Sequence, residues 1–220
     1  MNKPFNLPQL SKSKVSAVIV IDDVDNAGYL ADALLSGGVN SIELTLRTGA
    51  TFDAMDFISK RYPEMIVGAG TVLSPVQLEQ SIQSGAVFAV APGLNPKVVK
   101  KAKELNFPFV PGICTPSELE RAIRLQCSVV KFFPAEPSGG IKYLKSLASP
   151  FSHLDIKYIP LGGISLQSMP SYLDSELVLC IGGSWIAKRQ KIIKQDWKHI
   201  EENSRKVTSL IENHEKGSYE

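Results

Sequence analysis

The sequence has few of the residues that build disulfide frameworks or metal sites. Among its 220 residues there are three histidines and three cysteines, Cys114, Cys127 and Cys180. An odd number of cysteines without a C-x-x-C pair disfavours both a disulfide framework and a thiolate metal site. The histidines are far apart and lack metal-ligand spacing. We therefore expect a cytoplasmic protein with reduced thiols, no metal and no cofactor.

Long apolar runs and a strong charge of one sign are also lacking. No stretch is long enough to cross a membrane, and the first residues have no apolar core typical of a signal peptide. The formal net charge is +2, and the basic residues are scattered and do not cluster on one face. No Walker or G-x-G-x-x-G signature occurs. The composition therefore argues against nucleic-acid and membrane partners.

Short apolar runs alternate with amphipathic, helix-like stretches along the chain, and no linker rich in proline, glycine and serine divides it. Such strict alternation is typical of parallel strands connected by helices. Eight repeats favour a closed barrel over an open doubly wound sheet. The apolar runs lie at about residues 15–21, 40–46, 65–69, 86–90, 108–111, 128–133, 156–160 and 177–181.

The predicted fold is therefore a single (β/α)8 TIM barrel of the α/β class. We expect the barrel at residues 15–213, an N-terminal arm or helix at 1–14, and a frayed C-terminal tail at 214–220. Ser74, Asn95 and Thr115 each precede a proline, which is typical of a capping residue followed by the first helical position. Three helices are expected to begin there.

Polar and apolar residues alternate in the second apolar run. Strand geometry places Glu43, Thr45 and Arg47 on one face and the aliphatic residues between them on the other. The aliphatic face should contact helices, so the polar face should line the lumen near the carboxyl end, where barrel enzymes have their chemistry. A buried Glu43–Arg47 ion pair is the alternative, because a charge in the lumen is costly unless it is paired or used.

A lysine lies within the sixth apolar run, between two valines and two phenylalanines. Lys131 is two positions from both Val129 and Phe133, so the three side chains should lie on the same face of a strand. We expect that face to line the lumen. Burial disfavours the charged ammonium, and a neutral amine is a nucleophile that can attack a carbonyl carbon to form an iminium. The alternative is a lysine whose ammonium extends to solvent at the barrel mouth.

Glycine pairs follow the seventh and eighth apolar runs, at Gly162-Gly163 and Gly182-Gly183. Glycines at these positions let backbone N–H groups approach an anion, and barrels often bind phosphate in the loops after strands seven and eight. Two tight turns without a ligand are the alternative. Glycine- and proline-rich turns at the same rim add Thr71 and Pro92 to the candidate site residues.

Taken together, these stretches resemble the family of 2-keto-3-deoxy-6-phosphogluconate (KDPG) aldolases, also described as 4-hydroxy-2-oxoglutarate (KHG) aldolases. The resemblance covers about residues 15–190 in order and is specific as a set of motifs, although each motif alone is not. The motifs lie at residues 37–39, 43–48, 66–73, 91–94, 111–113, 131–136, 139–140, 162–165 and 180–185.

The resemblance implies a class I aldolase, a carbon–carbon lyase, and gives each candidate a role. Lys131 would form the Schiff base, and Glu43 would move protons, through a water molecule. Arg47 and Thr71 would bind the pyruvyl carboxylate, and Pro92 and Phe133 would form the walls of the pocket. The distal phosphate would be bound by Gly162, Gly163, Gly183 and Ser184. The family is typically a cytoplasmic homotrimer.

The implied reaction cleaves KDPG to pyruvate and glyceraldehyde 3-phosphate, with KHG giving pyruvate and glyoxylate as a second activity. Leu161 stands where the family pattern has a substrate-lining threonine, which leaves open an aldolase for the galacto epimer or a related 2-keto acid. Two other classes remain as alternatives: a phosphosugar-binding barrel without catalysis, and a phosphosugar isomerase. The joint presence of Glu43, Arg47 and Lys131 argues against the non-catalytic barrel.

Overall fold

Parallel strands form the centre of the structure, a computed structural model that describes residues 7–217. Six strands form one sheet in the order β5-β4-β3-β2-β1-β9, and three form a second sheet in the order β6-β7-β8. The strands are β1 (Val15–Ile19), β2 (Ser41–Thr45), β3 (Ile66–Gly70), β4 (Phe88–Val90), β5 (Phe109–Val110), β6 (Gly112–Ile113), β7 (Val129–Phe132), β8 (Lys157–Pro160) and β9 (Ile181–Gly183).

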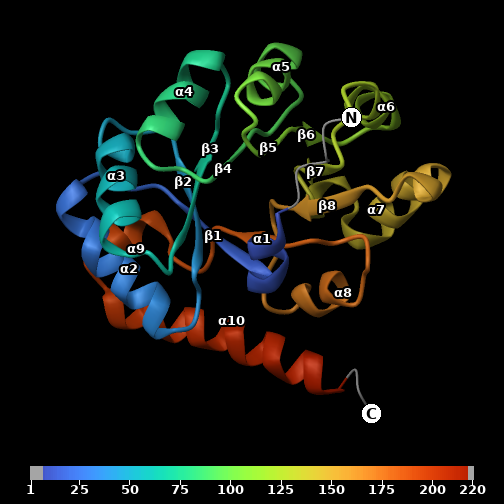
Figure 1. Cartoon of the computed structure of the whole chain (residues 1–220). Helices are drawn as coiled ribbons and strands as arrows, with labels where there is room; N and C mark the ends of the chain where they lie inside the picture. The colour runs from blue at the N-terminus through green and yellow to red at the C-terminus, as the bar shows by residue number, and fades with distance from the viewer. Residues whose placement is uncertain (1–6, 218–220) are drawn as a thin grey trace.

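Helices lie around the outside of these strands (Figure 1). Most of them connect one strand to the next, as the alternating sequence pattern predicts. They are α1 (Pro8–Ser13), η1 (Val24–Asn26), α2 (Ala27–Ser36), α3 (Thr51–Arg61), α4 (Pro75–Gln83), α5 (Pro96–Glu104), α6 (Pro116–Arg124), η2 (Glu136–Ser138), α7 (Gly140–Ala148), η3 (Ser149–Leu154), α8 (Met169–Leu173), α9 (Arg189–Ile193) and α10 (Trp197–Gly217).

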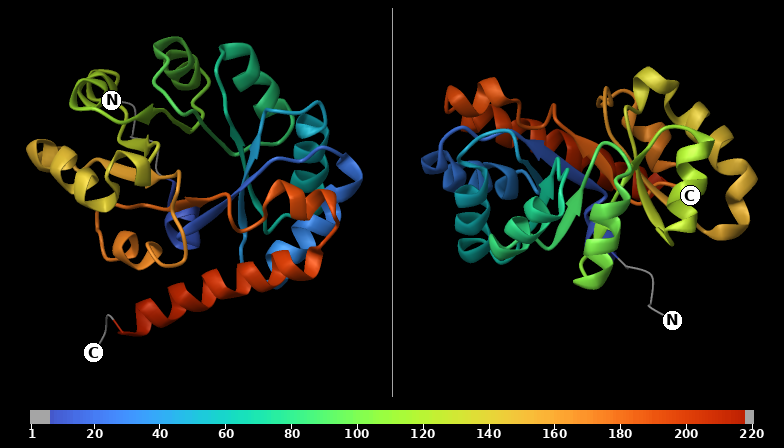
Figure 2. Two further views of the ribbon diagram at one scale, coloured as in Figure 1. Left: turned by 180° about the vertical axis from the view of Figure 1, so that it is seen from behind. Right: turned by 90° about the horizontal axis from the view of Figure 1, so that it is seen from above.

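The two sheets are adjacent at β8 and β9. Two isolated parallel bridges join them, one between Tyr158 and Val178 and one between Leu161 and Gly182. The strands curve around a common centre, and both views in Figure 2 show the helices on the outer side of this curve. The chain thus has an α/β fold with a curled parallel sheet.

Two strands differ from the sequence-based expectation. The fifth apolar run, 108–111, contains only the two-residue strand β5, and a further two-residue strand, β6, begins after Pro111, which has no N–H to donate to a strand ladder. The predicted eighth strand, 177–181, is wrong, because the strand begins only at Ile181. The preceding segment instead contacts β8, where the N–H of Leu179 donates to the carbonyl of Tyr158 at 2.9 Å.

The expected helix starts are confirmed. The side chains of Ser74 and Asn95 each accept a hydrogen bond from a backbone N–H in the first turn of the following helix. Thr115 and Glu118 form a reciprocal capping box at the start of α6. These caps satisfy backbone donors that the helices cannot pair internally.

Both predicted terminal segments include helical residues. α1 lies within the predicted arm, and the rest of that arm through residue 6 is outside the described residues. α10 continues through Gly217, so the predicted tail is helical up to that point, and residues 218–220 are outside the described residues. Among residues 7–217, no helix combines the length and apolar character needed to cross a lipid bilayer.

Helix α1 covers the amino ends of the strands, near the centre of Figure 1. Leu7 and Leu10 are buried in a cluster with Phe88, Ile159 and Cys180, which come from three different parts of the sheets. The arm therefore closes the end of the strands opposite to the one where the chemistry is expected.

Truncating Leu10 to alanine should lower the free energy of unfolding by about 2–5 kcal/mol, because the removed side chain leaves a cavity among buried residues. Leu10 is 1% exposed. Denaturant titration measures the change, and Lys12→Ala on the exposed side of the same helix is the control. Equal stabilities for the two variants would show that α1 does not contribute to the core.

Candidate active site

A buried ion pair lies across the strands between Lys131 on β7 and Glu43 on β2. The lysine Nζ is 3.2 Å from Oε1 and 3.3 Å from Oε2 of the glutamate. Lys131 is 4% exposed and Glu43 is 5% exposed. The alternative of a lysine extending to solvent is therefore wrong, and the glutamate contacts Lys131 and not Arg47.

The carboxylate of Glu43 fits because the neighbouring strand has no side chain beside it. A Cβ atom built on Gly70 of β3 would lie 2.0 Å from Oε1 of Glu43. Gly68, two positions earlier on the same face, leaves room in the same way for the ring of Phe88. Sequence reasoning missed this requirement, although the alternating glycines of β3 were an available signal.

The remaining pocket candidates lie where strands end. Thr71 directly follows β3, and Phe133 directly follows β7, and both are half-buried. Pro92 follows β4 and packs against Gly112, where a Cβ would lie 2.1 Å from the proline carbonyl oxygen. The ring centroid of Phe133 is 5.8 Å from the Nζ of Lys131. These residues therefore share the carboxyl rim with the ion pair.

The polar face predicted for the second strand is only partly continuous. β2 ends at Thr45, whose hydroxyl donates to the carbonyl of Ile19 on β1 at 2.7 Å. Arg47 lies beyond the strand in a bend, and its side chain is exposed. Glu43 therefore faces the interior, whereas Arg47 lies at the rim.

Threonine hydroxyls hold the turn that carries Arg47. Thr48 donates to the carbonyl of Ile21, and its Oγ1 is 3.0 Å from that of Thr51. Thr51 in turn donates to the carbonyl of Thr45 at 2.9 Å. Sequence reasoning missed these contacts, because a threonine in a turn gives no signal for the distant carbonyl that it reaches.

The glycine turns after β8 and β9 present backbone donors. Gly162 and Gly163 have φ values of 107° and 80°, in the left-handed region that favours glycine. Ser184 follows β9 and is exposed. The bridge between Leu161 and Gly182 pairs the N–H of Gly162 with the carbonyl of Gly182, whereas the N–H groups of Gly163 and Ser184 have no acceptor among the described residues. Such unpaired donors, gathered where two neighbouring strands end, are suited to an anion.

Leu161 forms an apolar wall between the glycine turns. It is 8% exposed. Its side chain occupies the space over Gly182, where a Cβ would lie 2.3 Å from the leucine Cδ1. The wall offers neither a donor nor an acceptor to a ligand.

Two of the three cysteines are poor nucleophiles. Burial raises the pKa of Cys127 to about 11 and that of Cys180 to about 12, so both thiols stay protonated near neutral pH. Within residues 7–217 there is also no cluster of three His, Cys, Asp or Glu side chains that could hold a metal ion. Lys131 is the buried nucleophile that the site presents.

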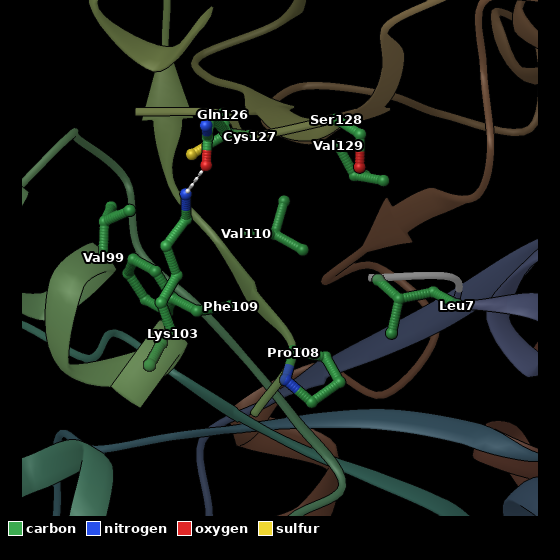
Figure 3. A pocket seen from close by; sticks show the side chains of 11 residues that line it. Leu7, Val99, Lys103, Pro108, Phe109, Val110, Gln126, Cys127, Ser128 and Val129 are labelled. Atoms are coloured by element: carbon green, nitrogen blue, oxygen red, sulfur yellow. Dashed lines mark hydrogen bonds between the residues drawn. The ribbon is translucent and has the colours of Figure 1, made fainter. Parts of the chain in front are cut away.

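A second pocket lies at the other end of the strands (Figure 3). Pro108 and Ser128, which precede β5 and β7, line it together with Leu7 from the N-terminal arm. Lys103 borders it and donates to the side-chain oxygen of Gln126 at 3.0 Å. The pocket is mostly apolar and does not include the ion pair, so it is not part of the candidate active site.

A buried lysine beside a carboxylate, at the carboxyl ends of curled parallel strands, defines a class I aldolase, in which a lysine forms a Schiff base with a carbonyl substrate. The chain belongs to the family of KDPG and KHG aldolases, whose sequence model matches residues 8–203. Members of this family are carbon–carbon lyases.

Individual relatives cover most of the chain. The KHG/KDPG aldolase of Escherichia coli strain K12 is 43% identical over 198 residues, which are 90% of this chain and 92% of that protein. The KDPG aldolase of Zymomonas mobilis ZM4 with 3-phosphoglycerate superposes with a TM-score of 0.85 at 35% identity, covering 92% and 95% of the two chains.

A further solved structure bears on the chemistry. The KDPG aldolase of Legionella pneumophila, with pyruvate captured at low pH as a covalent carbinolamine intermediate, superposes with a TM-score of 0.84. It is 35% identical and covers 89% of this chain and 94% of that one. A carbinolamine is the adduct that an amine forms with a ketone before water is lost, which agrees with class I aldolase chemistry.

Replacing Glu43 with glutamine should reduce kcat by about 100- to 10,000-fold, because the amide cannot transfer protons. The fold should persist, because the amide oxygen still accepts a hydrogen bond. Steady-state kinetics and thermal unfolding measure the two effects. Glu79→Gln, which changes an exposed glutamate paired with Lys101 at 2.6 Å, is the matched control. A near-normal kcat in Glu43→Gln would remove this residue from proton transfer.

Proposed function

We propose that this protein cleaves KDPG to pyruvate and glyceraldehyde 3-phosphate, and KHG to pyruvate and glyoxylate. The buried contact between Lys131 and Glu43 carries the proposal, because it brings a nucleophile and a proton acceptor together. The names of the E. coli and Z. mobilis relatives support the choice of substrates.

In the proposed first half-reaction, Lys131 becomes covalently attached to the substrate. Glu43, at 3.2 Å, takes a proton from the lysine ammonium, and the neutral amine attacks the C2 ketone carbon. The C2 oxygen takes one proton from the attacking nitrogen and one further proton, and then leaves as water, which forms the iminium. The proton that Glu43 holds is available for this step, directly or through a water molecule.

In the second half-reaction the iminium accepts the electrons of the breaking C3–C4 bond. Glu43 takes the proton of the C4 hydroxyl, directly or through water, and the aldehyde leaves. The resulting enamine on Lys131 is protonated at C3, and water then hydrolyses the pyruvate iminium. The iminium polarises the substrate carbonyl carbon, which is the task that a metal ion performs in other aldolases.

Substrate binding is proposed to use the rim around the ion pair. Arg47 and Thr71 hold the pyruvyl carboxylate, and Pro92 and Phe133 form pocket walls. Two observations support this role for Arg47: it is exposed in the bend after β2, and the threonine contacts hold the backbone of that turn.

The distal phosphate is proposed to bind the glycine turns at Gly162, Gly163, Gly183 and Ser184. Three observations support this: the unpaired N–H groups of Gly163 and Ser184, the bridge between Leu161 and Gly182 that brings the two turns together, and the phosphorylated compound named with the Z. mobilis structure.

An aldolase for the galacto epimer is the second candidate, and Leu161 favours it. A buried leucine in this wall cannot exchange a hydrogen bond with a substrate hydroxyl, so the discrimination between epimers at C4 differs from that of an enzyme with threonine there. The reaction class is the same for both candidates.

We also propose that the two sheets are arcs of one closed (β/α)8 barrel at residues 15–213, flanked by the N-terminal arm and the C-terminal segment. The bridges between β8 and β9 support closure on one side. On the other side, the carbonyl of Pro111, between β5 and β6, accepts a hydrogen bond from the N–H of Lys131 at 2.8 Å.

A cytoplasmic homotrimer is the proposed assembly and location. Leu73 and Val76 support self-association, because these neighbouring apolar side chains are 56% and 61% exposed in the single chain. The cytoplasmic location is supported by the three cysteines, which are all free.

Borohydride added together with pyruvate should attach one reduced pyruvyl group to Lys131, because reduction converts the iminium into a stable secondary amine. Intact-protein mass and peptide mapping measure the adduct and its position, and Lys131→Met is the control that should stay unmodified. A non-catalytic phosphosugar-binding barrel or an isomerase would give no adduct. An adduct at another lysine would contradict the proposed mechanism.

Changing Leu161 to threonine should alter the ratio of kcat/KM for the two C4 epimers by about tenfold, because a hydroxyl can then pair with the substrate. Leu161→Val is the matched control, since valine has the shape of threonine without its hydroxyl. Equal ratios in the two variants would mean that the leucine does not set the epimer preference.

A further inference from the structure

A short hydrogen bond links the turn after β7 to the helix after β8. The hydroxyl of Tyr172 on α8 donates to Oε1 of Glu136 at 2.5 Å. Tyr172 is 0% exposed, and burial together with the neighbouring carboxylate raises the pKa of its phenol. The phenol therefore keeps its proton and remains the donor.

Glu136 supports the glycine turn through its main chain and its side chain. Its N–H donates to the carbonyl of Gly162 at 2.9 Å, and the N–H of Ala135 donates to the carbonyl of Leu161 at 2.8 Å. A Cβ built on Gly163 would lie 2.8 Å from the Cβ of Glu136, so the glycine rests directly on this side chain. The turn after β8 is thus packed on the turn after β7.

Tyr172 completes this arrangement from the other end of the same loop. The loop leaves β8 at the glycine turn, and the chain then forms α8, which carries the tyrosine. Gly140, at the start of α7, packs against the pair: a Cβ there would lie 3.4 Å from Oε1 of Glu136 and 3.5 Å from the tyrosine oxygen. Glu136 therefore contacts both ends of the loop after β8, the glycine turn through its main chain and Tyr172 through its carboxylate.

We propose that Glu136 and Tyr172 are positioning residues that hold the turn after β8 and fix the direction of the Gly163 N–H group for the substrate phosphate. This proposal rests on the proposed function, because it assumes that the glycine turns bind phosphate. The pair acts through the turn that it supports, so it affects phosphate binding and leaves Schiff-base formation unchanged.

The test compares a substrate with a phosphate, KDPG, and one without, KHG. Tyr172→Phe removes only the hydroxyl, and KM for KDPG should rise about tenfold, the loss expected for one buried hydrogen bond. KM for KHG, and the rate of borohydride trapping with pyruvate, should stay at the wild-type values. Glu136→Gln keeps an acceptor for the phenol, so its KM for KDPG should rise less.

Tyr143→Phe is the matched control. Its hydroxyl donates to the carbonyl of Cys114 at 3.0 Å, so this variant also removes one tyrosine hydrogen bond but does not touch the Gly162 turn. KM for both substrates should be unchanged. The same increase in Tyr143→Phe would identify a general loss of packing and would overturn the positioning role.

The outcomes separate this inference from the proposed function. If the wild-type protein cleaves KHG but binds KDPG no more tightly, the phosphate site itself is wrong. If the wild-type protein prefers KDPG and Tyr172→Phe keeps that preference, or loses affinity for both substrates equally, the positioning role is wrong. If Tyr172→Phe does not fold, the hydrogen bond can be tested from Glu136 by comparing Glu136→Ala, which removes the acceptor, with Glu136→Gln, which keeps one. KM for KDPG, but not KM for KHG, should rise in the alanine variant.

Discussion

The buried contact between Lys131 and Glu43 limits which residues can surround it in the interior. Two charges removed from water are stable only when they are well paired, and removing either partner would leave the other unpaired. The sequence meets this requirement with a glycine at position 70, which leaves space for the carboxylate. The pair is thus part of the packing of the interior as well as the chemically competent part of the site.

The two ends of the strands have different roles. At the amino ends, α1 and the apolar residues beneath it close the interior, and the small pocket there has no catalytic groups. At the carboxyl ends, the turns carry the exposed arginine, the half-buried threonine and proline, and the glycine turns. Binding groups on turns around a rigid centre can be changed without altering the reaction. Leu161, where the family pattern has threonine, is such a change.

Much of this arrangement could be predicted from the sequence, because periodicity and parity are local properties. The alternation of apolar runs and helix-like stretches indicated parallel strands connected by helices, and the alternation of side chains along a strand indicated that Glu43 and Lys131 face the interior. Their contact joins positions 88 residues apart. The alternation of side chains along a strand shows which face a residue is on, but not which residue of a distant strand it contacts. The alternative of a Glu43–Arg47 ion pair was wrong because β2 ends at Thr45, before the arginine.

Other features were beyond local reasoning because they arise from packing. The delayed start of β9 follows from a bridge between Val178 and β8 that the apolar run does not encode. The support of the glycine turn by Glu136 and Tyr172 needs three segments to meet, and neither residue carries a sequence signal for it. The unpaired N–H group of Gly163 is likewise visible only when every acceptor around it is known.

A crystal structure of the protein soaked with pyruvate would show whether Lys131 is the nucleophile. We expect continuous density between the Nζ of Lys131 and C2 of pyruvate, with the carboxylate of Glu43 beside the new bond. Pyruvate held without a covalent bond, or joined to a different lysine, would contradict this expectation.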